Sequence, residues 1–125
     1  MSLDEVIFVE ENGVGIITLN RPERLNAITH PMVKKINHHL NVWEKNDGIK
    51  CIIIEGAGDR SFCAGGDVVK LRKEVLEAGG PPTDLSRSFF YDEYTLNYKI
   101  SNYSKPFIAL INGFTMGGGV GISMH

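Results

Sequence analysis

The sequence has 125 residues and a formal net charge of −2, from 13 basic and 15 acidic side chains. This near balance excludes the basic excess of nucleic-acid-binding domains and the acidic blocks of disordered tails. Two cysteines, Cys51 and Cys63, are too few for a disulfide framework and favour a reducing compartment.

The first half of the sequence predicts a β-hairpin followed by a strand–helix–strand unit. β-Branched runs at residues 6–9 and 14–19 flank the turn signal Asn12-Gly13. Thr29 is expected to be a helix N-cap, followed by one apolar helix face: Val33, Ile36, Leu40 and Trp43. We expect Gly48 to end that helix and residues 51–54 to form a strand buried on both faces, which implies a parallel crossover.

The second half predicts three more helices and one more strand. A helix with apolar residues at 68, 71 and 75 ends at Gly79-Gly80, and residues 81–84 form an exposed, mobile loop. A third helix covers residues 89–103, an apolar strand covers 107–111, and residues 117–119 open a fourth helix. Because that strand and helix have nothing downstream to pack against, we expect residues 1–125 to be the N-terminal part of one longer domain. A complete small domain is the alternative.

Residues 106–124 carry no charge and have the length of a marginal membrane span. Their five glycines, Pro106 and the Asn112-Gly113 turn signal favour a buried strand, a turn and a helix start instead. The first five residues fit neither a secretory signal nor an Arg-rich transit peptide.

Two glycine turns, each between an apolar strand and a helix, are the first candidate sites. In Phe62-Cys63-Ala64-Gly65-Gly66-Asp67, the unpaired N–H groups of the following helix could hold an anion or a developing oxyanion. The alternative is a tight turn with Asp67 as N-cap. Gly117-Gly118-Gly119 allows either a ligand or a second helix to approach closely. It is neither a Walker loop nor a dinucleotide fingerprint, since Ile122 stands where the latter needs glycine.

Glu93 is the third candidate, because it shares a helix face with Phe89, Leu96, Ile100 and Tyr103. An acid on an apolar face is partnered, at the edge of the face, or functional. Asp92 and the histidines at 30, 38, 39 and 125 are interpreted as surface residues without metal spacing. The basic residues are interpreted as solvated unless a polyanionic ligand is present: Arg21, Arg24, Lys34, Lys35, Lys70, Arg72 and Lys73.

Together with Ile17-Thr18-Leu19-Asn20-Arg21-Pro22 and Leu25-Asn26-Ala27, these motifs resemble the enoyl-CoA hydratase/isomerase (crotonase) superfamily over nearly the whole chain. Within it, residues 62–67, 90–97, 105–106 and 112–121 are most similar to the 3-hydroxyisobutyryl-CoA hydrolases. Asn112 stands where these hydrolases usually carry His, and hydratases also show Asn there. Gly121 stands where hydratases carry a catalytic Glu, which argues against hydration by a two-glutamate mechanism.

The resemblance implies an α/β fold, a crotonase-like spiral of ββα repeats with a parallel sheet flanked by helices. It implies hydrolysis of 3-hydroxyisobutyryl-CoA in valine catabolism, with coenzyme A as part of the substrate and with no metal or redox cofactor. The backbone N–H groups of Gly66 and Gly118 would form the oxyanion hole, and Glu93 and Gly118 would contact the acyl group. Coenzyme A would lie along these residues: Arg24, Leu25, Ala27, Ala64, Gly65, Gly66, Asp67 and Val68.

In the hydrolases that the sequence resembles, the catalytic Glu and its supporting Asp lie beyond the position of residue 125. We therefore expect this chain alone to be inactive. The alternatives are an enoyl-CoA hydratase or isomerase, and a non-catalytic acyl-CoA-binding module. The resemblance further implies oligomers formed through C-terminal elements, with no nucleic-acid or membrane partner. It implies the mitochondrial matrix for a eukaryotic protein and the cytoplasm for a bacterial one.

Overall fold

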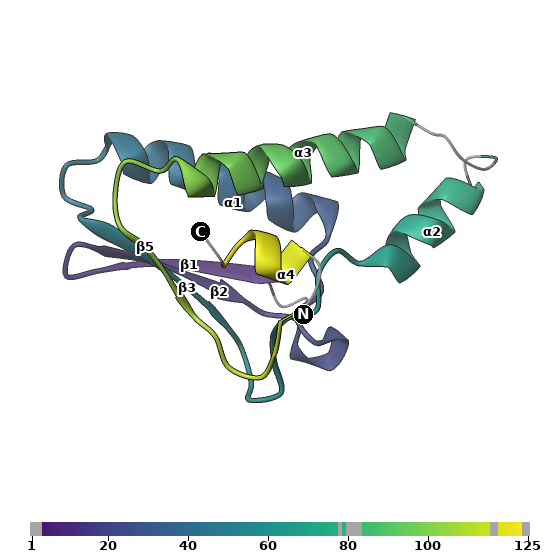
Figure 1. Ribbon diagram of the computed structural model, residues 1–125, viewed down its shortest axis with the longest axis horizontal. Coiled ribbons are helices and arrows are strands. Elements are labelled where there is room, and N and C mark those ends of the chain that lie inside the picture. Colours follow the sequence, from purple (N-terminus) through teal and green to yellow (C-terminus); the bar gives the residue numbers. More distant parts are fainter. Residues whose placement is uncertain (1–3, 78, 80–83, 116–117, 124–125) are drawn as a thin grey trace.

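The computed structural model describes residues 4–77, 79, 84–115 and 118–123 (Figure 1). Residues 81–83 of the loop predicted at 81–84, and Gly117 of the second glycine turn, lie outside these residues. The chain begins with the expected hairpin, β1 (Val6–Glu11) and β2 (Val14–Leu19). Its turn residues Asn12 and Gly13 both have positive φ, 52° and 79°, as a two-residue turn between twisted strands requires.

The main sheet has four strands in the order β1-β2-β3-β5, where β3 is Cys51–Gly56 and β5 is Phe107–Leu110. β1 pairs with β2 antiparallel, and both β2–β3 and β3–β5 are parallel. The predicted parallel crossover is therefore confirmed. A second, two-stranded parallel sheet joins β4 (Ser61–Cys63) to β6 (Phe114–Thr115).

Helices α1 (His30–Lys45) and α3 (Asp84–Ser101) lie along the same face of the main sheet (Figure 1). The predicted α1 face is buried against it, together with Ile17 and Leu19 of β2 and Ile52 and Ile54 of β3. The prediction that β3 is buried on both faces is wrong, because its alternate residues Cys51 and Ile53 are only half-buried. The helices cover one face, so the burial of β3 alternates with period two.

Two helix boundaries differ from the sequence expectation. α1 ends at Lys45, before Gly48, where the Lys105 ammonium group donates to the backbone oxygens of Trp43 and Asn46. A basic side chain from another segment thus satisfies carbonyls at the end of the helix. α3 begins at Asp84, five residues earlier than predicted.

The remaining helices are a 3-10 turn, η1 (Pro22–Arg24), and the helices α2 (Val68–Glu77) and α4 (Gly118–Gly121). α2 begins directly after the first glycine motif, and α4 begins at Gly118 within the second, where a helix start was predicted. Among the helices that the structure describes, none is long and apolar enough to cross a membrane.

Candidate functional site

The first glycine turn is fixed by backbone hydrogen bonds to the loop that precedes α1. The N–H of Ile28 donates to the Gly65 oxygen at 2.7 Å, and the N–H of Asp67 donates to the Ile28 oxygen at 2.7 Å. In this parallel bridge, neither bond uses the N–H of the intervening residue, Gly66, which the pattern directs away from Ile28. Gly65 has φ of 99°, in the left-handed region that favours glycine. The turn therefore holds its shape without using the Gly66 N–H.

The carboxylate of Glu93 lies against this turn. A β-carbon built on Gly66 would be 3.2 Å from Cζ of Phe89 and 3.8 Å from Oε1 of Glu93. The side chain of Glu93 is 8% exposed, and burial raises the pKa of its carboxyl group. Of the alternatives for Glu93, the structure excludes a solvated position at the edge of the helix face.

The two glycine turns lie at the same end of the small sheet. β4 and β6 run parallel, with Cys63 opposite Thr115, and each glycine turn follows the carboxyl end of its strand. A β-carbon on Gly119 would lie 2.4 Å from the backbone oxygen of Cys63, so the first turn of α4 packs directly on β4. The chain therefore brings Gly118, where α4 begins, to the edge that carries Gly66.

Cys63 lies between these turns but has no features of a nucleophile. The side chain is completely buried, and burial, with a smaller contribution from the Glu93 charge, raises its thiol pKa to about 12 despite a hydrogen bond from Gly65 N–H. A thiol with this pKa stays protonated at neutral pH.

A groove of about 440 Å³ opens beside Gly66. Its basic lining comes from Arg21, Arg24, Lys70 and Lys73, and its other lining residues are Ala27, Ala64, Gly66, Asp67 and Val69. Of the residues expected to contact coenzyme A, this groove gathers Arg24, Ala27, Ala64, Gly66 and Asp67. The groove lining that the structure describes does not include the other three expected residues: the backbone oxygens of Leu25 and Gly65 accept from the N–H groups of Ala64 and Ile28, and Val68 begins α2.

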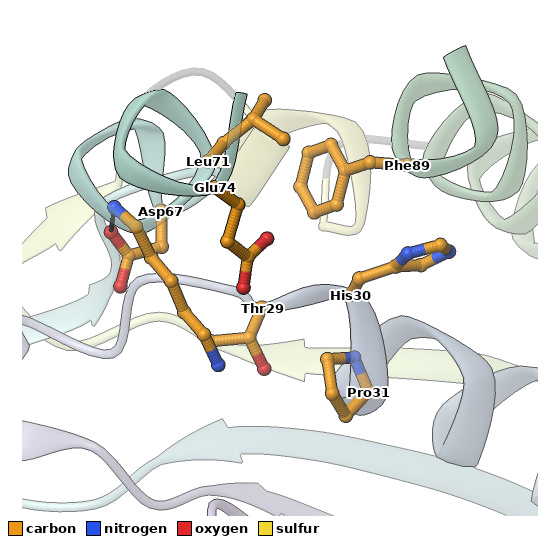
Figure 2. Close-up of a pocket in the computed structure, with 8 residues that line it drawn as sticks. Thr29, His30, Pro31, Asp67, Leu71, Glu74 and Phe89 are labelled. Atoms are coloured by element: carbon orange, nitrogen blue, oxygen red, sulfur yellow. Dashed lines mark hydrogen bonds between the residues drawn. The ribbon is translucent and has the colours of Figure 1, made fainter. Parts of the chain in front are cut away.

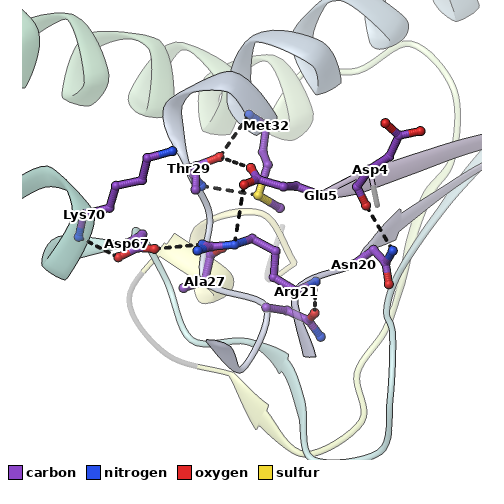
Figure 3. Close-up of polar contacts among 10 residues, drawn as sticks. Asp4, Glu5, Asn20, Arg21, Ala27, Thr29, Met32, Asp67 and Lys70 are labelled. Carbon is purple, nitrogen blue, oxygen red and sulfur yellow. Dashed lines mark hydrogen bonds and ion pairs between the residues drawn. The ribbon is translucent and has the colours of Figure 1, made fainter. Parts of the chain in front are cut away.

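Arg21 and Asp67 form the polar link between the groove and the helix starts (Figure 3). Nη1 of Arg21 lies 2.8 Å from Oδ2 of Asp67, and both side chains are 11% exposed. Arg21 also donates to the Ala27 oxygen at 2.8 Å. Burial opposes ionisation of Asp67, but the Lys70 N–H and the Arg21 guanidinium outweigh it, so the Asp67 pKa is below its ordinary value.

Asp67 is also the N-cap of α2, because its Oδ1 accepts from the Lys70 N–H at 2.9 Å. The N-cap role that the tight-turn alternative gave to Asp67 is thus confirmed, and the bridge to Ile28 does not use the Gly66 N–H. The Thr29 cap of α1 joins the same network, since its hydroxyl donates to Glu5 at 2.7 Å and Glu5 lies 3.9 Å from Arg21.

The surface interpretation of His30 and Asp92 is wrong. Their side chains meet at 2.6 Å between α1 and α3, and they are 14% and 28% exposed. The His30 ring also meets Phe89 edge-on, with ring centroids 5.6 Å apart. Figure 2 shows His30 and Phe89 beside a cavity of about 20 Å³, which Glu74 of α2 also lines. The contacts of His30 with Asp92 and Phe89 thus join the start of α1 to α3.

Sequence reasoning missed the importance of Asn26, which is completely buried between Arg24 and Ala27, two of the residues expected to contact coenzyme A. Its side chain accepts from the Arg21 N–H and donates to the backbone oxygens of Ala57 and Ser61. Leu25 and Asn26 have φ of 54° and 57°, a left-handed pair that costs backbone energy and that these hydrogen bonds stabilise. The signal available in the sequence was an Asn, the non-glycine residue most tolerant of this region.

Within the residues that the structure describes, no three His, Cys, Asp or Glu side chains come together in a group that could hold a metal ion.

A model of the enoyl-CoA hydratase/isomerase family matches residues 14–125 of this chain. The chain is 49% identical over 121 residues to a protein of Danio rerio named 3-hydroxyisobutyryl-CoA hydrolase, mitochondrial. That match covers 97% of this chain and 31% of the relative.

Solved structures agree on the fold. An enoyl-CoA hydratase from Rhodobacter sphaeroides superposes with a TM-score of 0.88 at 38% identity, over 95% of this chain and 34% of that one. A carnitinyl-CoA dehydratase from Mycobacterium thermoresistibile also gives 0.88, at 41% identity, over 96% of this chain and 34% of that one. The expected crotonase-like fold is confirmed, and the chain spans about a third of the length of the proteins that it matches.

Proposed function

Because the chain belongs to the enoyl-CoA hydratase/isomerase family, we propose that it supplies the coenzyme A groove and the oxyanion hole of a 3-hydroxyisobutyryl-CoA hydrolase. The observation that carries the proposal is the buried Glu93 carboxyl group, whose Oε1 lies 3.8 Å from the place of a β-carbon on Gly66, at a turn whose bridge to Ile28 does not use the Gly66 N–H. In this proposal, Glu93 is the polar group that contacts the acyl chain, and the Gly66 N–H is the donor to the thioester oxygen.

The proposed chemistry is addition of water to the thioester carbonyl. As the water oxygen bonds to carbon, the water gives one proton to the activating carboxylate and the carbonyl oxygen gains negative charge, which the N–H groups of Gly66 and Gly118 stabilise. The C–S bond then breaks, the thiolate of coenzyme A takes up a proton, and the 3-hydroxy acid leaves. By resemblance, the carboxylate that activates water lies beyond residue 125, and Glu93 contacts the acyl hydroxyl. No metal or redox cofactor takes part in this scheme.

The basic groove gives coenzyme A a chemically matched site. Its phosphates are polyanionic, and Arg24, Lys70 and Lys73 line the groove while Arg21 is already paired with Asp67. Exposed lysines attract phosphates through charge that salt screens. Binding of coenzyme A is therefore expected to weaken as ionic strength rises.

Two alternative functions differ from this proposal in what they require. A hydratase would need a carboxylate at position 121, where Gly121 has no side chain. A non-catalytic acyl-CoA-binding module would bind esters without releasing coenzyme A. The names of the curated relatives favour the mitochondrion for a eukaryotic protein and hydrolysis over both alternatives.

The test uses a hybrid enzyme, in which this chain replaces the matching segment of the Danio rerio relative, alongside the 125-residue chain itself. A thiol reagent measures coenzyme A released from 3-hydroxyisobutyryl-CoA, and circular dichroism checks folding. We expect the hybrid to release coenzyme A and the 125-residue chain to bind the ester without turnover. Hydration of an enoyl-CoA by the hybrid, without thiol release, would refute the hydrolase assignment.

Gly66→Pro in the hybrid tests the oxyanion hole, because it removes an N–H that the bridge to Ile28 does not use. Loss of one oxyanion donor lowers kcat about 10²- to 10³-fold. Gly66→Ala is the matched control: it keeps the N–H, and its β-carbon only requires Phe89 to shift slightly. Equal losses in the two folded variants would exclude the proposed role of the N–H.

A further inference from the structure

Asn97 lies on α3 one helical turn after Glu93, and the proposed mechanism does not use it. Residues four apart share one face of a helix. The face that presents Glu93 to Gly66 therefore also carries the Asn97 amide.

That amide contacts the other glycine turn. A β-carbon at Gly121 would lie 2.6 Å from Nδ2 and 3.1 Å from Oδ1 of Asn97, and the former separation is closer than real β-carbons approach. The amide thus fills the space that a side chain at position 121 would occupy. Asn97 is matched in size to Gly121, between α3 and the first turn of α4.

The carbonyl end of this amide has an unused acceptor. Oδ1 of Asn97 is buried and has no hydrogen-bond partner among the residues that the structure describes. Native proteins rarely leave a buried acceptor unsatisfied, because the group has given up its water without gaining a donor. A donor that arrives with a ligand would satisfy it.

We propose that Asn97 determines acyl specificity: its Oδ1 accepts a hydrogen bond from a hydroxyl on the acyl group, and its amide sets the width of the site beside Gly121. The inference rests on the proposed function in taking acyl-CoA thioesters as ligands. A hydroxyl donates one hydrogen and still accepts through its lone pairs. It can therefore donate to Asn97 and still accept a hydrogen bond from another donor in the site.

The test compares two esters that differ only in the hydroxyl, 3-hydroxyisobutyryl-CoA and isobutyryl-CoA, with the hybrid enzyme. Asn97→Leu keeps the volume and removes the acceptor. We expect kcat/KM to fall about three- to tenfold on the hydroxylated ester, the range for one neutral hydrogen bond, with little change on the other. Asn41→Leu, at an exposed position of α1, makes the same chemical change and should alter neither.

A second variant tests the pairing with Gly121. Gly121→Ala would displace the Asn97 amide, so it should cause the same selective loss. Asn97→Ala makes room for the new methyl group. In the double variant, the loss of kcat/KM should therefore be smaller than the sum of the losses in Gly121→Ala and Asn97→Ala. This double-mutant cycle tests the role of Asn97 even if Asn97→Leu does not fold.

Competition binding of the two esters gives a readout that does not need turnover. If the hybrid releases no coenzyme A, the hydrolase proposal fails, but a binding preference for the hydroxylated ester that Asn97→Leu removes would still support the inference. Equal losses on both esters in the folded variants, or an unchanged preference, would overturn it.

Discussion

Replacing Asp67 by Asn should separate the charge of this residue from its role as helix cap. Asn caps a helix about as well as Asp, so the hydrogen bond from the Lys70 N–H survives. What is lost is the ionic contact to Arg21 at 2.8 Å, between side chains that are each 11% exposed. A hydrogen bond between charged groups contributes about 1.5–3 kcal/mol, so we expect that loss in the free energy of unfolding at pH 7.

The pH dependence follows from the lowered pKa of Asp67. A carboxyl group whose folded pKa lies below its unfolded value of 3.8 stabilises the fold above that value. The contribution is lost as pH falls through the folded pKa. The stability difference between wild type and Asp67→Asn should therefore be constant above about pH 5 and should shrink in acid.

Urea unfolding of the 125-residue chain, followed by circular dichroism, measures this difference. A double-mutant cycle with Arg21→Met isolates the pair, and Asp47→Asn, an exposed acid after α1, is the matched control. We expect a coupling of more than about 1 kcal/mol at pH 7, and a change within about 0.5 kcal/mol for the control. A coupling near zero, or one that persists unchanged at pH 2, would refute the assignment of this stabilisation to the ion pair.

Three further predictions concern stability and are measured by the same unfolding assay. Asn26→Ala should lower the free energy of unfolding by at least about 3 kcal/mol, because it leaves buried backbone groups unpaired; a loss below about 1 kcal/mol would contradict this. Glu93→Gln should raise stability at neutral pH, since burial disfavours the carboxylate, and the gain should vanish as pH falls below the unfolded value of 4.5. A gain that did not depend on pH would exclude ionisation as its cause. Lys105→Ala should destabilise the chain by about 1 kcal/mol through the uncapped end of α1, and an unchanged midpoint would show that water replaces the ammonium group fully.

The parts of the fold that were predictable from the sequence depend on local signals. The Asn12-Gly13 turn and the Thr29 cap each act within a few residues, and the α1 stripe needs only helical periodicity. β4 and β6 were not predicted because they are two or three residues long and exist only by pairing with each other across about fifty residues. No local pattern distinguishes such strands from loop.

The candidate site shows the same division. The glycine turns and Glu93 were recognisable because glycine pairs and an acid on an apolar stripe are local anomalies. The partners of His30 and Asn26 were not, because they lie 62 residues away on α3 and 31–35 residues away near β4. The early start of α3 at Asp84 was missed because the prolines before it favoured loop, although Asp is itself a good residue for a helix start.

Ser61 joins two segments of the candidate site that are far apart in the sequence. Its buried hydroxyl lies 2.8 Å from the Leu25 oxygen and 3.0 Å from the Phe114 oxygen, so one side chain contacts both the segment proposed to bind coenzyme A and β6. These segments are 36 and 53 residues from Ser61 in the chain, and local unfolding of either would dismantle the groove. If the groove binds coenzyme A as proposed, ligand affinity and global stability are linked by mass action: coenzyme A at a hundred times its dissociation constant would stabilise the folded chain by about 2.7 kcal/mol. A thermal or urea midpoint that rises with coenzyme A concentration would thus report binding with no chemistry at all.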